Sequence, residues 1–179
     1  MPLFWPVALA VALLAGDPPP ISPFGEPAAT RGDAVPGRIE LSDGTTHRGR
    51  IYLTRDHRLK IYDEQTQRQR EVPLQAVRQI DCLVKNEEMK KEWRFKETTS
   101  DEKLYTGRRY PQREYVHTIT LADGQTITGP MSAIVYLDTN TDPKETKTFL
   151  LHKRDKGAIG KNLKSLVYVK QIKIENSSP

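Results

Sequence analysis

The sequence predicts a mainly β protein in which two tandem small five-stranded bent-sheet barrels are joined by a charged linker. Short stretches alternate apolar and polar residues, which is the period of a half-buried strand. Asp-Gly pairs separate some of these stretches and favour tight hairpin turns. The same blocks of sequence also occur twice in the same order. A sheet that bends and closes on itself removes its exposed edges, so short strands at this spacing favour small barrels.

The internal repeat consists of two separate blocks. Residues 39–49 (IELSDGTTHRG) match residues 119–129 (ITLADGQTITG) in Ile, Leu, Asp, Gly, Thr and Gly. Residues 74–80 (LQAVRQI) match residues 166–172 (LVYVKQI) in Leu, Val, a basic residue, Gln and Ile. Because both blocks recur in the same order, the chain is predicted to contain two copies of one unit.

Each copy is expected to contain the same elements. Residues 37–84 form the first predicted barrel repeat and residues 115–175 the second. A strand precedes the Asp-Gly turn, further short strands follow it, and one helical turn leads into a last strand. In the first copy the helical turn is expected at residues 72–74, before a last strand at 77–84. In the second copy, apolar residues between 119 and 137 keep odd parity and so share one face of the sheet.

Residues 85–114 form the predicted linker between the copies. Glu and Lys at helical spacing between residues 87 and 96 favour a short helix there. The rest of the linker is polar and contains aromatic residues scattered among basic ones. We expect these aromatic side chains to pack the linker onto the barrels, with an exposed stacking platform as the alternative. They are Trp93, Phe95, Tyr105, Tyr110 and Tyr115.

The N-terminal segment has features of an export signal. Residues 3–15 are apolar, but a membrane-spanning helix needs about 20 such residues. Residues 1–16 are therefore predicted to be a signal peptide, and the protein to be periplasmic, secreted or in the cell envelope. An uncleaved membrane tether is the alternative, and no further membrane span is expected. Residues 17–36 are rich in Pro, Gly and Ala, which predicts a disordered tether.

No catalytic constellation is visible in the sequence. Cys82 is the only cysteine, so it cannot form an internal disulfide, and its apolar strand pattern predicts a buried thiol. The four histidines lack metal-ligand spacing, and no serine has a nucleophile-elbow pattern around it. Asp43 and Asp123 each precede a glycine, where turn formation explains them. We therefore expect no enzymatic activity, catalytic residue, metal site or cofactor.

The excess positive charge lies near the end of the chain. The formal net charge is +5, and residues 147–175 hold eight Lys or Arg against two acidic residues. Such a patch favours phosphates, acidic polysaccharides, acidic proteins or anionic lipid head groups.

Within this patch, the loop HKRDKGAIGKN at residues 152–162 is the best candidate site. Its spacing does not match a nucleotide-binding phosphate loop. Its glycines could let backbone N–H groups approach an anion, and its basic side chains could neutralise the charge. The alternative is a solvated hairpin tip. The candidate anion-binding or partner-binding residues are His152, Lys153, Arg154, Lys156, Gly157, Gly160, Lys161 and Lys164.

The pattern I-x-L-x-D-G-x-x-x-x-G-x-I at residues 39–51 resembles the first half of the Sm-like fold. Members of that family are bent five-stranded barrels, often assembled into rings that bind single-stranded RNA. The resemblance implies the barrel for each copy. It does not imply RNA binding, because His57, Arg58 and Leu59 follow Asp56 where the family has an Asn. The family's hydrophobic-Arg-Gly motif is also replaced here, by the sequence VRQI at residues 77–80.

The function hypothesis is an exported, non-enzymatic binding or interaction module that engages an acidic polymer or protein through the basic loop. A structural or assembly protein of the cell envelope with no small ligand is the alternative. A third hypothesis is nucleic-acid binding by an Sm-like surface, which export does not favour. Association that depends on concentration but not on salt would favour the assembly protein, since salt weakens exposed ionic contacts.

Overall fold

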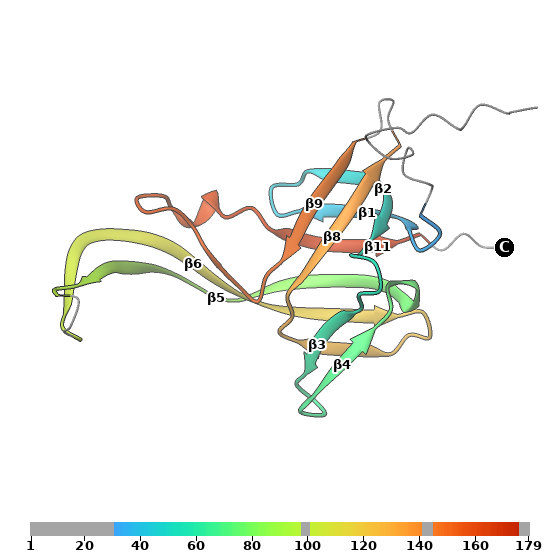
Figure 1. The fold of residues 1–179 in the computed structure, drawn as a ribbon, viewed down its shortest axis with the longest axis horizontal. Coiled ribbons are helices and arrows are strands. Elements are labelled where there is room, and N and C mark those ends of the chain that lie inside the picture. The colour runs from blue at the N-terminus through green and yellow to red at the C-terminus, as the bar shows by residue number, and fades with distance from the viewer. Residues whose placement is uncertain (1–30, 98–100, 141–144, 176–179) are drawn as a thin grey trace, which may run out of the picture. The chain divides into compact units, whose positions relative to one another are not determined.

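The computed structural model describes residues 31–97, 101–140 and 145–175, and it is built of antiparallel strands with almost no helix (Figure 1). The predicted mainly β class is therefore confirmed. The predicted signal segment and most of the predicted tether lie outside the described residues. No described helix is long and apolar enough to cross a membrane. The elements are β1 (Val35–Leu41), β2 (Thr46–Tyr52), β3 (Leu59–Asp63), β4 (Arg68–Val72), η1 (Leu74–Ala76), β5 (Val77–Phe95), β6 (Lys103–Leu121), β7 (Thr126–Gly129), β8 (Ala133–Thr139), β9 (Thr146–Leu151), β10 (Arg154–Lys156), η2 (Leu163–Ser165) and β11 (Val169–Ile174).

Two boundaries differ from those expected. The first strand begins at Val35, inside the predicted tether at 17–36. Val35 and Pro36 already pair with Ile51 and Arg50 of β2, so they belong to the sheet. The helical turn expected at residues 72–74 lies two residues later, at η1, where Pro73 provides the N-cap.

One large sheet has the strand order β10-β6-β5-β11-β1-β2-β8-β9, and β7 pairs with β6 on the same edge as β10, farther along the strand. The β3–β4 hairpin extends this arrangement. Its strand β3 lies beside β7, because Glu64 N donates to Thr128 O at 2.9 Å and Tyr62 N donates to Pro130 O at 3.3 Å. An isolated bridge between Ile61 and Met131 continues the same register.

Strands of the two predicted copies pair with one another. Strand β2 of the first copy pairs with β8 of the second copy, and β3 of the first copy lies beside β7 of the second. The last strand β11 pairs with the first strand β1, while β5 pairs with β6. In each predicted copy, therefore, some strands have a strand of the other predicted copy as their neighbour in the sheet.

A single hydrophobic cluster joins residues from both predicted copies. Burial of each large aliphatic side chain contributes about 1.5–3 kcal/mol, and here those contributions depend on both copies at once. The largest fully buried aliphatic members are Ile39, Ile51, Leu59, Ile61, Val77 and Ile80 from the first copy and Ile119, Ile127, Val135, Leu137 and Ile172 from the second.

The Asp-Gly turns have the expected geometry. Asp43 Oδ1 accepts a hydrogen bond from Thr45 N, and Asp123 Oδ1 accepts one from Gln125 N, both at 2.9 Å. The glycine that follows each aspartate has a positive φ of 87° or 88°. The interpretation of Asp43 and Asp123 as turn residues is thus confirmed.

The glycines that end the first repeat block have a different role. A Cβ at Gly49 would overlap the backbone oxygen of Asp138, and a Cβ at Gly129 would overlap the backbone oxygen of Tyr62. In both cases the close backbone belongs to a strand of the other predicted copy. Glycine is required there because the neighbouring strand leaves no room for any side chain.

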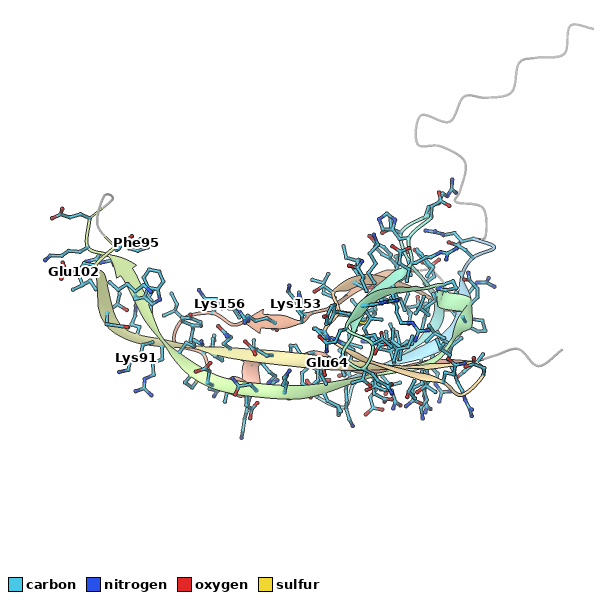
Figure 2. The ribbon with its side chains drawn as sticks, turned by 90° about the horizontal axis from the view of Figure 1, so that it is seen from below. Glu64, Lys91, Phe95, Glu102, Lys153 and Lys156 are labelled. Carbon is cyan, nitrogen blue, oxygen red and sulfur yellow. The ribbon has the colours of Figure 1, made fainter. Side chains whose placement is uncertain are left out.

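The short helix expected between residues 87 and 96 is wrong, because these residues form the distal half of β5. They pair with β6 from Asn86↔Glu114 to Phe95↔Lys103. Cross-strand pairing over this length outweighs the weak preference of Glu and Lys for helix. We call residues 86–95 and 103–114 the arm. Figure 2 shows it extending away from the other strands, with β10 beside its base.

Candidate binding surface

The predicted basic loop lies along the base of the arm. Its residues 154–156 form β10 and pair with β6, with Arg154 opposite Glu114 and Lys156 opposite Gln112. The segment is therefore part of the sheet and not a free hairpin tip. Figure 2 shows Lys153 and Lys156 at the start and end of this short strand.

The two loop glycines do not form a backbone cradle for an anion. Gly157 N donates to Pro111 O at 2.9 Å, and Gly160 N donates to Arg109 O at 2.8 Å. Both N–H groups are thus used to fasten the loop to the arm. Gly157 also packs closely, since a Cβ there would lie 2.6 Å from Pro111 Cγ, and Gly160 has a φ of +81°.

The basic side chains of the loop have different surroundings. Arg154 forms an ion pair with Glu114 at 2.6 Å, and Lys156 Nζ lies 4.2 Å from the centroid of the Tyr110 ring, within cation–π range. Lys153, Lys161 and Lys164 are exposed and have no ion pair with any described residue. His152 is half-buried and lines a separate cavity. These three lysines are therefore available to form ion pairs with an anionic partner.

Arg113, which the sequence did not single out, holds the loop to the arm. Its guanidinium is largely buried and donates to Leu166 O at 2.9 Å and to Leu163 O at 3.2 Å. It also forms an ion pair with Glu87 at 2.9 Å. These contacts fix η2 against β6. The part of the basic loop between β10 and η2 is therefore held at both ends.

The most unusual electrostatic feature is a like-charged pair across the arm. Lys91 and Arg109 are directly opposite each other on β5 and β6, an arrangement that destabilises a ribbon. Neither has an ion pair within the described part of the chain. The hydrogen bond from Gly160 N to Arg109 O fastens the loop backbone beside Arg109, one residue before Lys161. We call Lys91, Arg109 and Lys161 the cationic junction.

The neighbouring arginine is compensated, unlike Arg109. Glu92 accepts hydrogen bonds from Arg108 Nε at 2.7 Å and from the hydroxyl of Thr106. Hydrogen bonds from Thr106 and then Arg108 lower the pKa of Glu92, so it is a carboxylate at neutral pH. Because Glu92 is already bound by Arg108 and Thr106, it does not compensate the charges of Lys91 and Arg109.

Three linker aromatics are exposed at the far end of the arm, so the expectation that they pack onto the rest of the protein is wrong for them. Trp93, Phe95 and Tyr105 are 40%, 51% and 60% exposed. Trp93 pairs with Tyr105 across the strands and makes an edge contact with Phe95 at a centroid distance of 5.0 Å. Lys103 Nζ lies 4.5 Å over the Trp93 ring. In contrast, Tyr115 is buried, as expected.

The described residues show no metal-binding group of three or more His, Cys, Asp or Glu side chains. Cys82 is buried, which confirms the prediction, and burial raises the pKa of its thiol to about 12. A thiol with that pKa is protonated at neutral pH and is a poor nucleophile.

Comparison with known proteins found no match: no family model, no curated protein and no solved structure resembles the chain significantly.

Proposed function

We propose that the protein is an exported, non-enzymatic binding module that holds an anionic partner, an acidic polymer or protein, at the cationic junction and the adjoining basic loop. The observation that carries this proposal is the Lys91–Arg109 pair. Two opposed cations without a counter-charge raise the energy of the free arm. An anion placed between them would remove that repulsion, so binding would stabilise the arm as well as the complex.

We also propose that the strands form two Sm-like small barrels, each completed by the other copy. The neighbours β11-β1-β2-β8-β9 would form one barrel and β5-β6-β7-β3-β4 the other. The direct pairing of Ile80 with Ile172 supports this proposal, because these residues occupy equivalent positions in the two matched blocks. Such a pairing is what a two-fold relation between the copies would produce.

The exposed aromatic residues extend the proposed surface to the end of the arm. Aromatic and arginine side chains are enriched where proteins contact their partners. Trp93 and Tyr105 would supply apolar contact beyond the charged junction, which a simple polyanion would not need. An acidic protein or an acidic polymer with apolar groups would use both parts.

Reversing both charges of the opposed pair, with Lys91→Glu and Arg109→Glu, is expected to weaken binding of heparin, used as a polyanion probe, by roughly tenfold or more. The wild-type affinity should fall as salt rises, because exposed ionic contacts are screened. The affinity is measured by isothermal titration calorimetry at two salt concentrations. Neutral variants, Lys91→Gln and Arg109→Gln, should show a smaller loss in the same direction.

A matched control reverses two exposed cations elsewhere, Arg68→Glu and Arg78→Glu, and so changes the net charge equally. This control should keep most of the affinity. Equal loss in both double variants would show that only net charge matters and would contradict the site. Absent heparin binding, together with association that salt does not weaken, would favour the assembly protein. Tighter binding of a single-stranded oligonucleotide than of heparin would favour the nucleic-acid hypothesis.

A further inference from the structure

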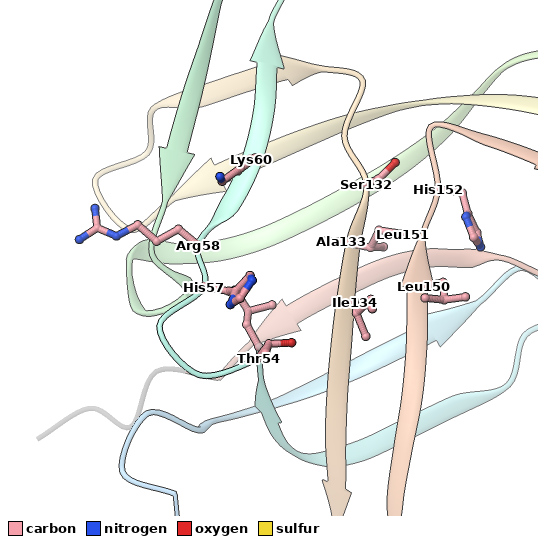
Figure 3. A pocket seen from close by; sticks show the side chains of 11 residues that line it. Thr54, His57, Arg58, Lys60, Ser132, Ala133, Ile134, Leu150, Leu151 and His152 are labelled. Atoms are coloured by element: carbon pink, nitrogen blue, oxygen red, sulfur yellow. The ribbon is translucent and has the colours of Figure 1, made fainter.

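A cavity of about 410 Å³ lies at the connection between β2 and β3, and it shares no residue with the arm (Figure 3). One side is formed by that connection and the start of β3. The other side is formed by the paired ends of β8 and β9. Its volume is within the range of small-molecule sites in proteins. The described residues that line it are Leu53, Thr54, His57, Arg58, Lys60, Ser132, Ala133, Ile134, Leu150, Leu151 and His152.

The β8–β9 side of the cavity is apolar. Ile134 and Leu150 are directly paired across the two strands, and each is almost half exposed, at 45% and 47%. Their neighbours Ala133 and Leu151 form the next pair along the same strands. A pair of large aliphatic side chains left partly open to solvent inside a concavity would be stabilised by an apolar ligand, since burial of that surface is favourable.

Every ionisable side chain that lines the cavity is basic. His57, Arg58, Lys60 and His152 face no carboxylate among the lining residues. Arg58 has no ion pair with any described residue, and Lys60 has only an exposed pair with Glu71 at 3.4 Å. The ring of His57 is held by a contact of 3.0 Å between its Nδ1 and Arg55 O. The rim thus offers positive charge to a ligand that brings its own negative group.

The connection that forms the basic side is a departure from the repeat. Residues 53–58 join β2 to β3, whereas residues 130–132 join β7 to β8 in the second copy, half the length. The strand crossing itself therefore needs only the shorter connection. The longer one contains the lining residues His57 and Arg58, and its Asp56 is in the left-handed region, with a φ of +60°. The extra length builds the cavity.

We propose that this cavity is a binding site for a small amphipathic carboxylate. The alkyl part of the ligand lies against Ile134 and Leu150, and its carboxylate is held by Arg58 with His57 and Lys60. Inorganic phosphate would leave the apolar side uncovered, and a neutral alcohol would leave the cations uncompensated. The cavity shares His152 with the basic loop of the proposed polyanion surface and shares no residue with the cationic junction.

The test is calorimetric titration of the full chain with decanoate. Decanol probes the apolar contact alone, and inorganic phosphate probes the charged contact alone. We expect decanoate to bind, and decanol and phosphate to bind at least about tenfold more weakly. Arg58→Glu should weaken decanoate binding at least tenfold. The pair Ile134→Thr and Leu150→Thr should do the same without unfolding the protein, because both side chains are partly exposed.

The matched control is Arg55→Glu, which reverses an exposed charge in the same connection but outside the lining. It should leave decanoate affinity unchanged. Absence of decanoate binding would overturn the proposal, and so would equal binding of decanol or phosphate, or equal loss in the Arg55 and Arg58 variants. Heparin binding should persist in the Arg58→Glu protein and so distinguishes the two proposals, because Arg58 lies in neither the cationic junction nor the basic loop.

Discussion

Replacing Gly129 by alanine is expected to lower the free energy of unfolding by at least about 3 kcal/mol. The new Cβ would overlap the backbone oxygen of Tyr62. Strand β3 cannot move away without losing the hydrogen bonds from Glu64 N to Thr128 O and from Tyr62 N to Pro130 O. Gly49→Ala should have a similar effect through Asp138, and urea unfolding followed by circular dichroism measures both.

Two other glycines are the controls. Gly32 has open space where a Cβ would be placed, so Gly32→Ala should change stability by less than about 0.5 kcal/mol. Gly124 also has open space but a φ of +88°, so Gly124→Ala should cost about 1 kcal/mol from backbone strain. If Gly129→Ala were no worse than Gly124→Ala, the close crossing of the exchanged strands would be contradicted.

Acidification is expected to destabilise the protein through His117 by about 3 kcal/mol. The side chain is fully buried on β6, and neither ring nitrogen has a hydrogen-bond partner among the described residues. Burial, with a smaller contribution from the charge of His152, lowers the pKa of His117 from 6.5 to about 4. The unfolded chain therefore binds a proton at a pH where the folded protein does not. The stability from neutral His117 is complete above the unfolded pKa and is lost as the pH falls from 6.5 towards 4.

His117→Leu separates this effect from that of the carboxylates. Glu40, Asp43, Asp63 and Glu92 have lowered pKa values in the folded protein, so acid also reduces stability through them in both proteins. The wild-type protein should lose more stability than His117→Leu between neutral pH and pH of about 4.5. Urea unfolding at both pH values gives the difference. Parallel losses in the two proteins would mean that His117 is not held neutral by burial.

The local elements could be predicted from the sequence, but the strand pairing could not. Alternation and Asp-Gly turns locate β1, β2, β6 and β7, because each signal lies within a few residues. Whether β2 pairs with β3 or with β8 depends on contacts far apart in the chain, and either choice buries the same apolar faces. One local signal was present: Gly49 and Gly129 recur at equivalent positions where no turn needs them.

The candidate surface was predicted in part. Composition located the basic loop, whereas the opposed pair of Lys91 and Arg109 follows from a register that shifts between Lys91 and Trp93. A shift of this kind changes which side chains face each other, and no spacing rule in the sequence reveals it. The helical expectation for the arm failed for the same reason, since the partner strand β6 decides the structure. Arg113 was missed because its partners are backbone carbonyls near η2.

Separating the chain within the arm tests most directly whether the two copies complete each other. The fragments are residues 32–97 and 101–179, each expressed alone and then mixed in equal amounts. Strand β2 lacks its neighbour β8 in the first fragment, and β7 lacks its neighbour β3 in the second. We predict no cooperative unfolding transition for either fragment alone and a single transition, with recovered strand signal, for the mixture. A cooperative transition in either isolated fragment would contradict strand exchange.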